Sequence, residues 1–209
     1  MNTIFRYMKK ILLLLSLAMV FSNCSSNGSA CCGSDGDCCK GGFLGLVADR
    51  YSVRKFDSAA VEQEKTDLIL KAGQLAPTAV NAQPQKIYVV RTPEMMKALN
   101  EVSPCIYGAP QCFVICYDAN VAAHKGENGS WGEVDATIVT THMMLEAANL
   151  GIGTCLVGYF DPQALSRALN LPENIVPVLM MPYGYAAEDC EPSPKHTDRK
   201  AIEETVSYL

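Results

Sequence analysis

Several kinds of site are missing from this sequence, and each absence excludes a class of chemistry. Residues 41–209 contain no His/Cys/Asp cluster at metal-ligand spacing, no nucleophile motif and no glycine-rich loop of the dinucleotide-binding type. A metal centre, a nucleophilic side chain and a Rossmann-type nucleotide site are therefore not predicted in that range. The formal charge is −5, from 17 Lys and Arg against 22 Asp and Glu, so nothing favours binding to nucleic acid.

A hydrophobic run long enough to cross a bilayer is also missing from the N-terminal region. The apolar stretch at residues 11–21 follows a basic start but is shorter than the ~20 residues that a spanning helix needs. It predicts a signal peptide over residues 1–23. Cys24 follows with serines behind it, which resembles a bacterial lipoprotein cleavage site with Cys24 as the acylated residue. An uncleaved anchor and ordinary signal cleavage are the alternatives.

Residues 24–42 are rich in Cys, Gly and Ser and are predicted to form a tether before a domain at residues 43–209. Four cysteines of the tether form two adjacent pairs, Cys31-Cys32 and Cys38-Cys39. They could bind a soft metal, form disulfides or have no role in a disordered segment. The domain has five more cysteines, mostly in apolar strands, which are interpreted as small core residues. These are Cys105, Cys112, Cys116, Cys155 and Cys190.

Helical and strand patterns alternate irregularly along the domain, which predicts an α+β fold. Helices are expected at residues 59–75, 93–101 and 136–150, with a short one after Asp161-Pro162, and strands at 86–91, 112–117 and 176–185. Asp57-Ser58, Thr92 and Asp161 are the expected helix caps. The 136–150 helix has few polar residues and is expected to be buried nearly all round, with His142 as a core histidine.

Two segments carry the polar chemistry of the domain. Residues 50–56, Arg-Tyr-Ser-Val-Arg-Lys-Phe, place three cations beside a hydroxyl, a combination suited to phosphate or another anion. Residues 76–84, Ala-Pro-Thr-Ala-Val-Asn-Ala-Gln-Pro, leave a helix at a proline and present a hydroxyl and two amides. Such a loop suits hydrogen bonding to the edge of a heteroaromatic ring. Together the segments predict a pocket for an anionic ligand with a polar ring.

The order of motifs carries a wider resemblance. After the two segments come Gly108-Ala109-Pro110, an apolar helix opened by Asp135, the run 150–155, the run 157–161 and Arg199-Lys200. This order resembles the nitroreductase family of FMN-dependent oxidoreductases over about residues 45–209. The resemblance implies a mainly antiparallel sheet flanked by helices, and a homodimer with a domain-sized interface that holds the flavins. Gln85, where an aromatic residue is usual, and the short polar region between Tyr117 and Trp131 depart from the family pattern.

The resemblance also implies roles for individual positions. It assigns the phosphate to Arg50, Ser52 and Arg199, with Tyr51 in the same segment, and places Arg54 near N1 and O2 of the ring. It assigns the ribityl chain and ring to Asn81 and Gln83, the flavin of the opposite subunit to Pro77 and Thr78, and the region near N5 to the backbone of Leu156, Val157 and Gly158. No catalytic side chain is expected, because in this family the flavin carries the chemistry.

The function implied by the resemblance is reduction of a small electron-poor acceptor, such as a nitroaromatic or a quinone, through flavin N5. The usual donor is NADH or NADPH. A lipid-anchored protein of the cell envelope would not meet that donor, so either the protein is cytoplasmic or another donor serves it. Two alternatives remain: a membrane-anchored protein that holds flavin or another ligand without turnover, and a metal-handling lipoprotein that uses its cysteine-rich tether.

Overall fold

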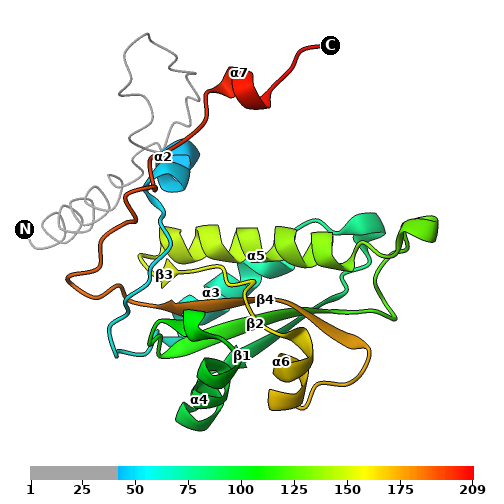
Figure 1. The fold of residues 1–209 in the computed structure, drawn as a ribbon, viewed down its shortest axis with the longest axis horizontal. Coiled ribbons are helices and arrows are strands. Elements are labelled where there is room, and N and C mark those ends of the chain that lie inside the picture. Colours follow the sequence, from blue (N-terminus) through cyan, green and yellow to red (C-terminus); the bar gives the residue numbers. More distant parts are fainter. Residues whose placement is uncertain (1–41) are drawn as a thin grey trace, which may run out of the picture. The chain divides into compact units, whose positions relative to one another are not determined.

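The computed structural model describes residues 42–209, which form a four-stranded sheet with helices on both faces (Figure 1). The predicted signal peptide, Cys24 and the two cysteine pairs of the tether lie outside the described residues. The helices are α2 (Gly42–Asp49), α3 (Gln63–Gln74), α4 (Pro93–Val102), α5 (Gly132–Asn149), α6 (Pro162–Ala168) and α7 (Ile202–Thr205). The strands are β1 (Gln85–Val90), β2 (Gln111–Asp118), β3 (Gly153–Thr154) and β4 (Ile175–Gly184). No helix in this range has the length and apolar character to cross a bilayer.

The sheet is antiparallel throughout, in the order β1-β2-β4-β3. Its central strand, β2, is buried on both faces because successive side chains of a strand point to opposite sides. Cys112, Val114 and Cys116 belong to one apolar layer, and Phe113 and Ile115 belong to the other. The α+β prediction with a mainly antiparallel sheet is confirmed.

Helices α3 and α5 cover one face of the sheet, and α4 and α6 lie on the other face (Figure 1). On the first face, the Phe113 ring stacks on the Tyr183 ring with the centroids 4.1 Å apart. On the second face, Leu99 of α4 and Leu165 of α6 are fully buried against the sheet. Each such side chain contributes about 1.5–3 kcal/mol by leaving water. Both layers therefore hold the sheet in place, and its edge can support a site.

Local signals set several helix ends where the sequence predicted them. The Thr92 hydroxyl accepts the Met95 N–H (3.3 Å) at the start of α4, and the Asp161 carboxylate accepts the Gln163 N–H (2.9 Å) at the start of α6. Gly151 follows the end of α5 with φ +73°, a conformation that glycine adopts without strain.

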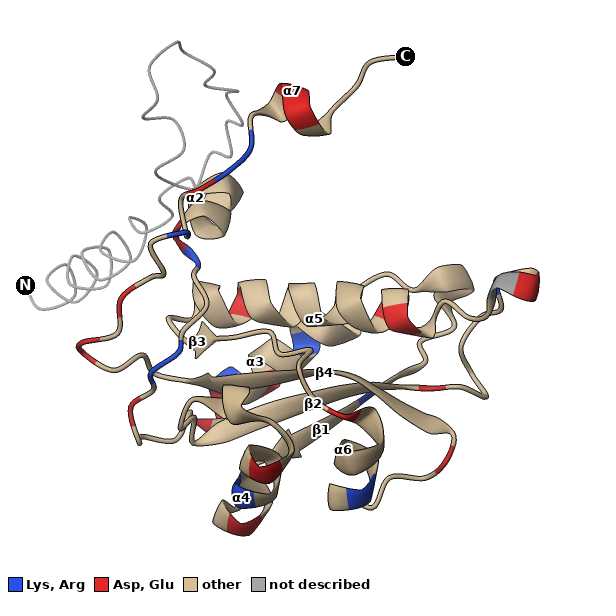
Figure 2. Cartoon of the chain, in the orientation of Figure 1, with Lys and Arg blue, Asp and Glu red and all other residues tan. Residues whose placement is uncertain are grey.

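Helix α5 begins at Gly132, earlier than predicted, and it has one buried face. That face consists of small and apolar residues at helical spacing, namely Ala136, Val139, Met143 and Ala147. The opposite face carries Val134, which is 36% exposed, and the partly exposed Ile138 and Leu145. Figure 2 shows few charged positions along this helix. The expectation of burial nearly all round is therefore wrong for the single chain. His142 is also exposed, with Nδ1 2.9 Å from the Ile138 carbonyl oxygen, so the core interpretation of His142 is wrong.

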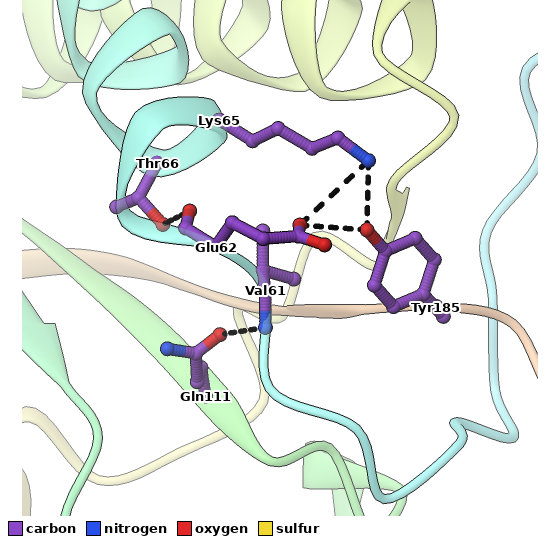
Figure 3. A network of polar contacts seen from close by, with 6 residues as sticks. All are labelled: Val61, Glu62, Lys65, Thr66, Gln111 and Tyr185. Carbon is purple, nitrogen blue, oxygen red and sulfur yellow. Dashed lines mark hydrogen bonds and ion pairs between the residues drawn. The ribbon is translucent and has the colours of Figure 1, made fainter.

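Helix α3 begins at Gln63, later than the sequence predicted. The Asp57 carboxylate accepts the Ala59 N–H (2.7 Å) and so closes a turn instead of capping a helix. Val61 is then buried in extended backbone, and its N–H donates to Oε1 of Gln111 on β2 (2.8 Å) (Figure 3). Burial of Val61 therefore overrides the local cap signal and delays the helix.

A polar network joins the first turn of α3 to the chain just beyond β4 (Figure 3). The Lys65 ammonium donates to the Tyr185 hydroxyl (2.7 Å), and that hydroxyl donates to a carboxylate oxygen of Glu62 (2.7 Å). The hydrogen bond that Tyr185 donates is the main cause that lowers the pKa of Glu62, and the one that it accepts is the main cause that raises the pKa of Lys65. The network fixes the start of the helix whose other end leads into residues 77–83.

Candidate functional site

The segment 50–54 runs beside β3 at the edge of the sheet. Ser52 forms a parallel bridge with Thr154, and the Val53 N–H donates to the Thr154 carbonyl oxygen (2.9 Å). Val53 is 2% exposed, so its side chain points into the protein and its neighbours Ser52 and Arg54 point the other way. The buried valine thus fixes the position of the polar residues on either side of it.

These polar residues line a pocket of about 300 Å³ together with the C-terminal segment that precedes α7. We call it the cationic pocket. Its lining residues are Arg50, Tyr51, Ser52, Arg54, Ser193, Lys195, His196 and Arg199. Figure 2 shows basic stretches on both of the contributing segments. The structure therefore brings together the Arg50–Arg54 residues and Arg199, which lie far apart in the sequence.

The positive charge of the cationic pocket is not neutralised within residues 42–209. In this range no carboxylate lies within ion-pair distance of Arg50, Arg54, Lys195 or Arg199. Arg54 donates to the Ser52 carbonyl oxygen (3.3 Å) and Arg199 to the Asp198 carbonyl oxygen (2.8 Å), which leaves further N–H groups of each guanidinium available. Guanidinium groups beside hydroxyls have the donors and the charge that suit a phosphate dianion.

Contacts between the two segments hold the pocket together. The Tyr51 hydroxyl donates to the Cys190 carbonyl oxygen (3.4 Å), Lys55 pairs with Asp189, and the Ala187 N–H donates to the Lys55 carbonyl oxygen (3.0 Å). Partial burial is the main cause that raises the pKa of Tyr51, so this phenol remains a neutral donor at physiological pH.

Residues 155–158 continue along the same edge of the sheet beyond β3. The Val157 backbone pairs with Met180 on β4 through hydrogen bonds of 2.8 and 2.9 Å, and the Val157 side chain is buried. Leu156 and Gly158 are exposed. Burial raises the pKa of the neighbouring Cys155 thiol, while the Arg54 charge opposes the rise. Cys155, which directly precedes the predicted residues 156–158, therefore lies close to Arg54 of the cationic pocket.

The other predicted segment, residues 77–83, lies elsewhere in the chain. Pro77 and Thr78 line a second pocket of about 300 Å³ together with Trp131, Asp135 and Ile138 of the N-terminal part of α5. The cationic pocket has its neighbours at the C-terminal end of this helix, since Arg50 also lines a hollow with Ala148 and Gly151. Asp135, which lines the second pocket, and Ala148, which lines that hollow, are 13 residues apart in α5, about 20 Å along the helix axis. One chain therefore does not bring all the predicted site residues together.

The loop 77–83 is strained, and hydrogen bonds within it and to α5 hold it in place. Val80, Asn81 and Gln83 have φ angles of 48°, 57° and 50°, in the left-handed region that non-glycine residues seldom adopt. The Gln83 N–H donates to the Thr78 hydroxyl (3.0 Å), and the Ala79 N–H donates to Oδ1 of Asp135 (2.9 Å). Asp135 is 1% exposed, and its Oδ2 has no partner within residues 42–209. Its side chain fixes a loop with outward-facing polar groups.

Sequence reasoning missed Ser193, Lys195 and His196 as pocket residues. Lys195 and His196 lie within four positions of Arg199, and that proximity was the signal that could have identified them. Asp135 was recognised as the start of a helix but not as the support of the loop.

Known proteins resemble this chain in sequence and in fold. Residues 47–104 and 103–185 match the nitroreductase family. A Methanothermobacter thermautotrophicus protein, provisionally named NADH dehydrogenase/NAD(P)H nitroreductase, is 30% identical over 162 residues, which cover 74% of this chain and 83% of that protein. A Bacillus subtilis FMN reductase [NAD(P)H] is 28% identical over 182 residues, covering 78% of this chain and 73% of the relative.

Among solved structures, a nitroreductase family protein from Clostridium difficile 630 superimposes with a TM-score of 0.76 and 33% identity, covering 80% of this chain and 98% of the other. An FMN-dependent nitroreductase from Clostridium difficile R20291 gives a TM-score of 0.66 and 25% identity, covering 79% and 98%. The fold, the edge-of-sheet pocket and these matches identify the chain as an oxidoreductase of the nitroreductase family.

Proposed function

We propose that the protein is an FMN-dependent oxidoreductase that reduces a small electron-poor acceptor, such as a nitroaromatic or a quinone, with NAD(P)H or another electron donor as the reductant. The observation that carries the proposal is the cationic pocket, which combines hydroxyls with four cations that have no carboxylate partner among residues 42–209. This donor set fits the terminal phosphate of FMN. An FMN reductase and an FMN-dependent nitroreductase among the similar proteins support the same cofactor.

In this proposal, the chain binds and orients the cofactor. Arg50, Ser52 and Arg199 hold the phosphate, while Arg54 stabilises negative charge on the N1 and O2 edge of the ring. The backbone of Leu156–Gly158 supports the region around N5. When bound, FMN supplies the hydride chemistry. No side chain is required as an acid or base.

We further propose that the functional unit is a homodimer with two sites at its interface. Within one chain, the cationic pocket and the loop 77–83 lie near opposite ends of α5, too far apart to hold one flavin. A second copy would bring Pro77, Thr78, Asn81 and Gln83 to the first copy's pocket. The exposed Val134 and the partly exposed Ile138 of α5 provide apolar surface for such an interface.

For location, we propose a lipid anchor at Cys24 that holds the protein to the bacterial cell envelope, on sequence grounds alone. Mass analysis of the purified full chain tests this point: an acylated N-terminal cysteine is the expected result. A chain that retains residues 1–23 in the cytoplasm would contradict it and would place the domain where NAD(P)H is available.

The cofactor proposal is tested with the purified full-length protein. It should be yellow and release FMN on denaturation, and it should oxidise NADH or NADPH when a nitroaromatic or quinone is added. A colourless protein that cannot be reconstituted with FMN would contradict the proposal. Bound FMN without turnover from NAD(P)H or from reduced flavin would instead identify a flavin-binding protein. Metal bound in proportion to Cys31, Cys32, Cys38 and Cys39 would favour the metal-handling alternative.

A further inference from the structure

We propose that His196 is a further binding residue for the ligand's phosphate and that its protonation strengthens the grip of the cationic pocket. This inference rests on the proposed function, because it concerns the same FMN phosphate. His196 lines the pocket with Arg50, Lys195 and Arg199. Unlike those residues, a histidine gains or loses its charge between pH 5 and 8.

The contacts of His196 determine which ring nitrogen can titrate. Its Nε2 lies 3.0 Å from the Ala48 carbonyl oxygen. Since a carbonyl oxygen only accepts hydrogen bonds, Nε2 carries the proton in both charge states. This ring makes no other hydrogen bond within residues 42–209. Nδ1 is therefore the ring nitrogen left for a contact with the ligand phosphate, and in the imidazolium form it is a donor.

The anchoring carbonyl has a favourable position for a charged imidazole. Ala48 is at the C-terminal end of α2, where the last carbonyl groups lack partners within the helix and carry partial negative charge. A ring N–H that donates to that carbonyl satisfies one of the unpaired acceptors at the helix end. The ring also meets the Tyr51 ring edge-on, with centroids 6.2 Å apart, so its plane is fixed beside the pocket.

Other charged groups surround His196, and none of them reproduces its pH dependence. Arginine and lysine side chains keep their charge up to pH 8.5 in general, and carboxylates keep theirs above pH 6. Burial raises the pKa of Tyr51 further above this range. The groups concerned are Asp49 at the end of α2, Arg50, Tyr51 and Arg54 in the adjacent segment, and Lys195, Asp198 and Arg199 in its own segment.

The sign of the effect follows from the charges. A phosphate monoester becomes fully dianionic as pH rises past its second pKa of about 6, which by itself strengthens binding to a cationic site. Loss of the imidazolium charge works in the opposite direction. Between pH 6.5 and 8.5 the phosphate changes little, so the affinity for FMN should fall as His196 loses its proton. Removal of one positive charge near a dianion should weaken binding about fivefold to tenfold.

The test measures the dissociation constant of FMN at pH 6.5, 7.5 and 8.5 by quenching of flavin fluorescence, using the full chain after removal of bound flavin. The wild type should bind about fivefold to tenfold less tightly at pH 8.5 than at pH 6.5. H196Q should bind FMN more weakly than the wild type at pH 6.5 and lose most of the pH dependence. H124Q is the matched control, because His124 lies in the 119–131 region outside the pocket.

Riboflavin, which has the ring but no phosphate, separates the failure modes. H196Q should bind riboflavin as the wild type does at each pH. The same pH dependence in H196Q as in the wild type, or an equal loss of riboflavin and FMN affinity, would overturn the role of His196 while leaving FMN binding intact. A wild type that binds no FMN at any pH would instead overturn the proposed function itself.

Discussion

Replacement of Gly153 by alanine should lower the stability of the protein and the ligand affinity of the cationic pocket together. A Cβ atom at position 153 would lie 2.5 Å from Cγ2 and 3.0 Å from Cβ of Val53. Both positions are in the packed edge of the sheet, so Val53 or its backbone must shift. Such overpacking costs about 1–3 kcal/mol, a fraction of the ~5–15 kcal/mol that stabilises a typical domain. The shift displaces Ser52 and Arg54, which flank Val53 and line the pocket.

A double-mutant cycle isolates this contact. V53A alone should cost about 2 kcal/mol, because it removes two buried methyl groups and leaves a small cavity. The G153A/V53A variant should cost at least about 1 kcal/mol less than the sum of the single changes, since the added methyl then occupies the vacated space. Urea unfolding gives the free energies, and FMN titration gives the affinity.

The control for the cycle is G158A. Its added Cβ would meet only Cδ2 of Leu179, at 3.8 Å, so the free energy of unfolding should not change. Strict additivity of the two single substitutions would refute the reasoning, since it would mean that residues 53 and 153 do not constrain each other. A destabilised G153A with unchanged FMN affinity would refute the link between Val53 and the pocket.

Three other outcomes follow from the described contacts. R50A should weaken FMN binding about tenfold or more in titration, because a charge-assisted hydrogen bond is lost, whereas R167A on α6 should not; equal affinity would place the phosphate elsewhere. V134D should weaken dimerisation about tenfold or more in light scattering without unfolding the chain, and an unchanged dimer would exclude this face. The pKa of Glu62 is lower in the folded protein than its unfolded value near 4.5, so ionised Glu62 stabilises the fold at pH values above 4.5. This stabilisation is lost as the pH falls through the folded pKa of Glu62. Y185F should reduce that loss in acid unfolding curves, and an unaltered curve would exclude the Tyr185 hydrogen bond as its cause.

Local features made much of the fold predictable. Thr92 and Asp161 cap helices through hydrogen bonds to residues two or three positions away, so a few consecutive residues of the sequence suffice to predict these helix starts. The continuous apolar run of β2 indicates a strand that is buried on both faces. Asp57 gave a similar signal for the start of α3. Val61, however, is held by Gln111, which lies 50 positions away in the sequence, so neighbouring residues could not predict that contact.

The site was predictable only in part, for related reasons. Arg50, Ser52 and Arg54 share one segment, but Lys195 and His196 join them through contacts such as Tyr51 to Cys190, which are 139 positions apart in the sequence. The segment carrying Lys195 and His196 is irregular and has no period that could reveal which side chains face inward. For helix α5, composition predicts that its apolar residues are covered. It does not show whether the core of the same chain or a second copy of the protein covers them.

The two parts of the site share an energetic property that favours a common ligand. At one end of α5, the cationic pocket gathers like charges without a carboxylate partner among the described residues, which raises the energy of the unliganded chain. At the other end, Val80 is 89% exposed at φ 48°, and residues held in such conformations cost about 1–3 kcal/mol each. Neither feature stabilises the isolated chain. A dianionic ligand relieves the repulsion in the first region, and a rigid ring contacted by the loop would use the conformation fixed in the second. A flavin nucleotide with its phosphate in one copy's pocket and its ring against the other copy's loop would satisfy both requirements with one molecule, whereas a simple anion would satisfy only the first.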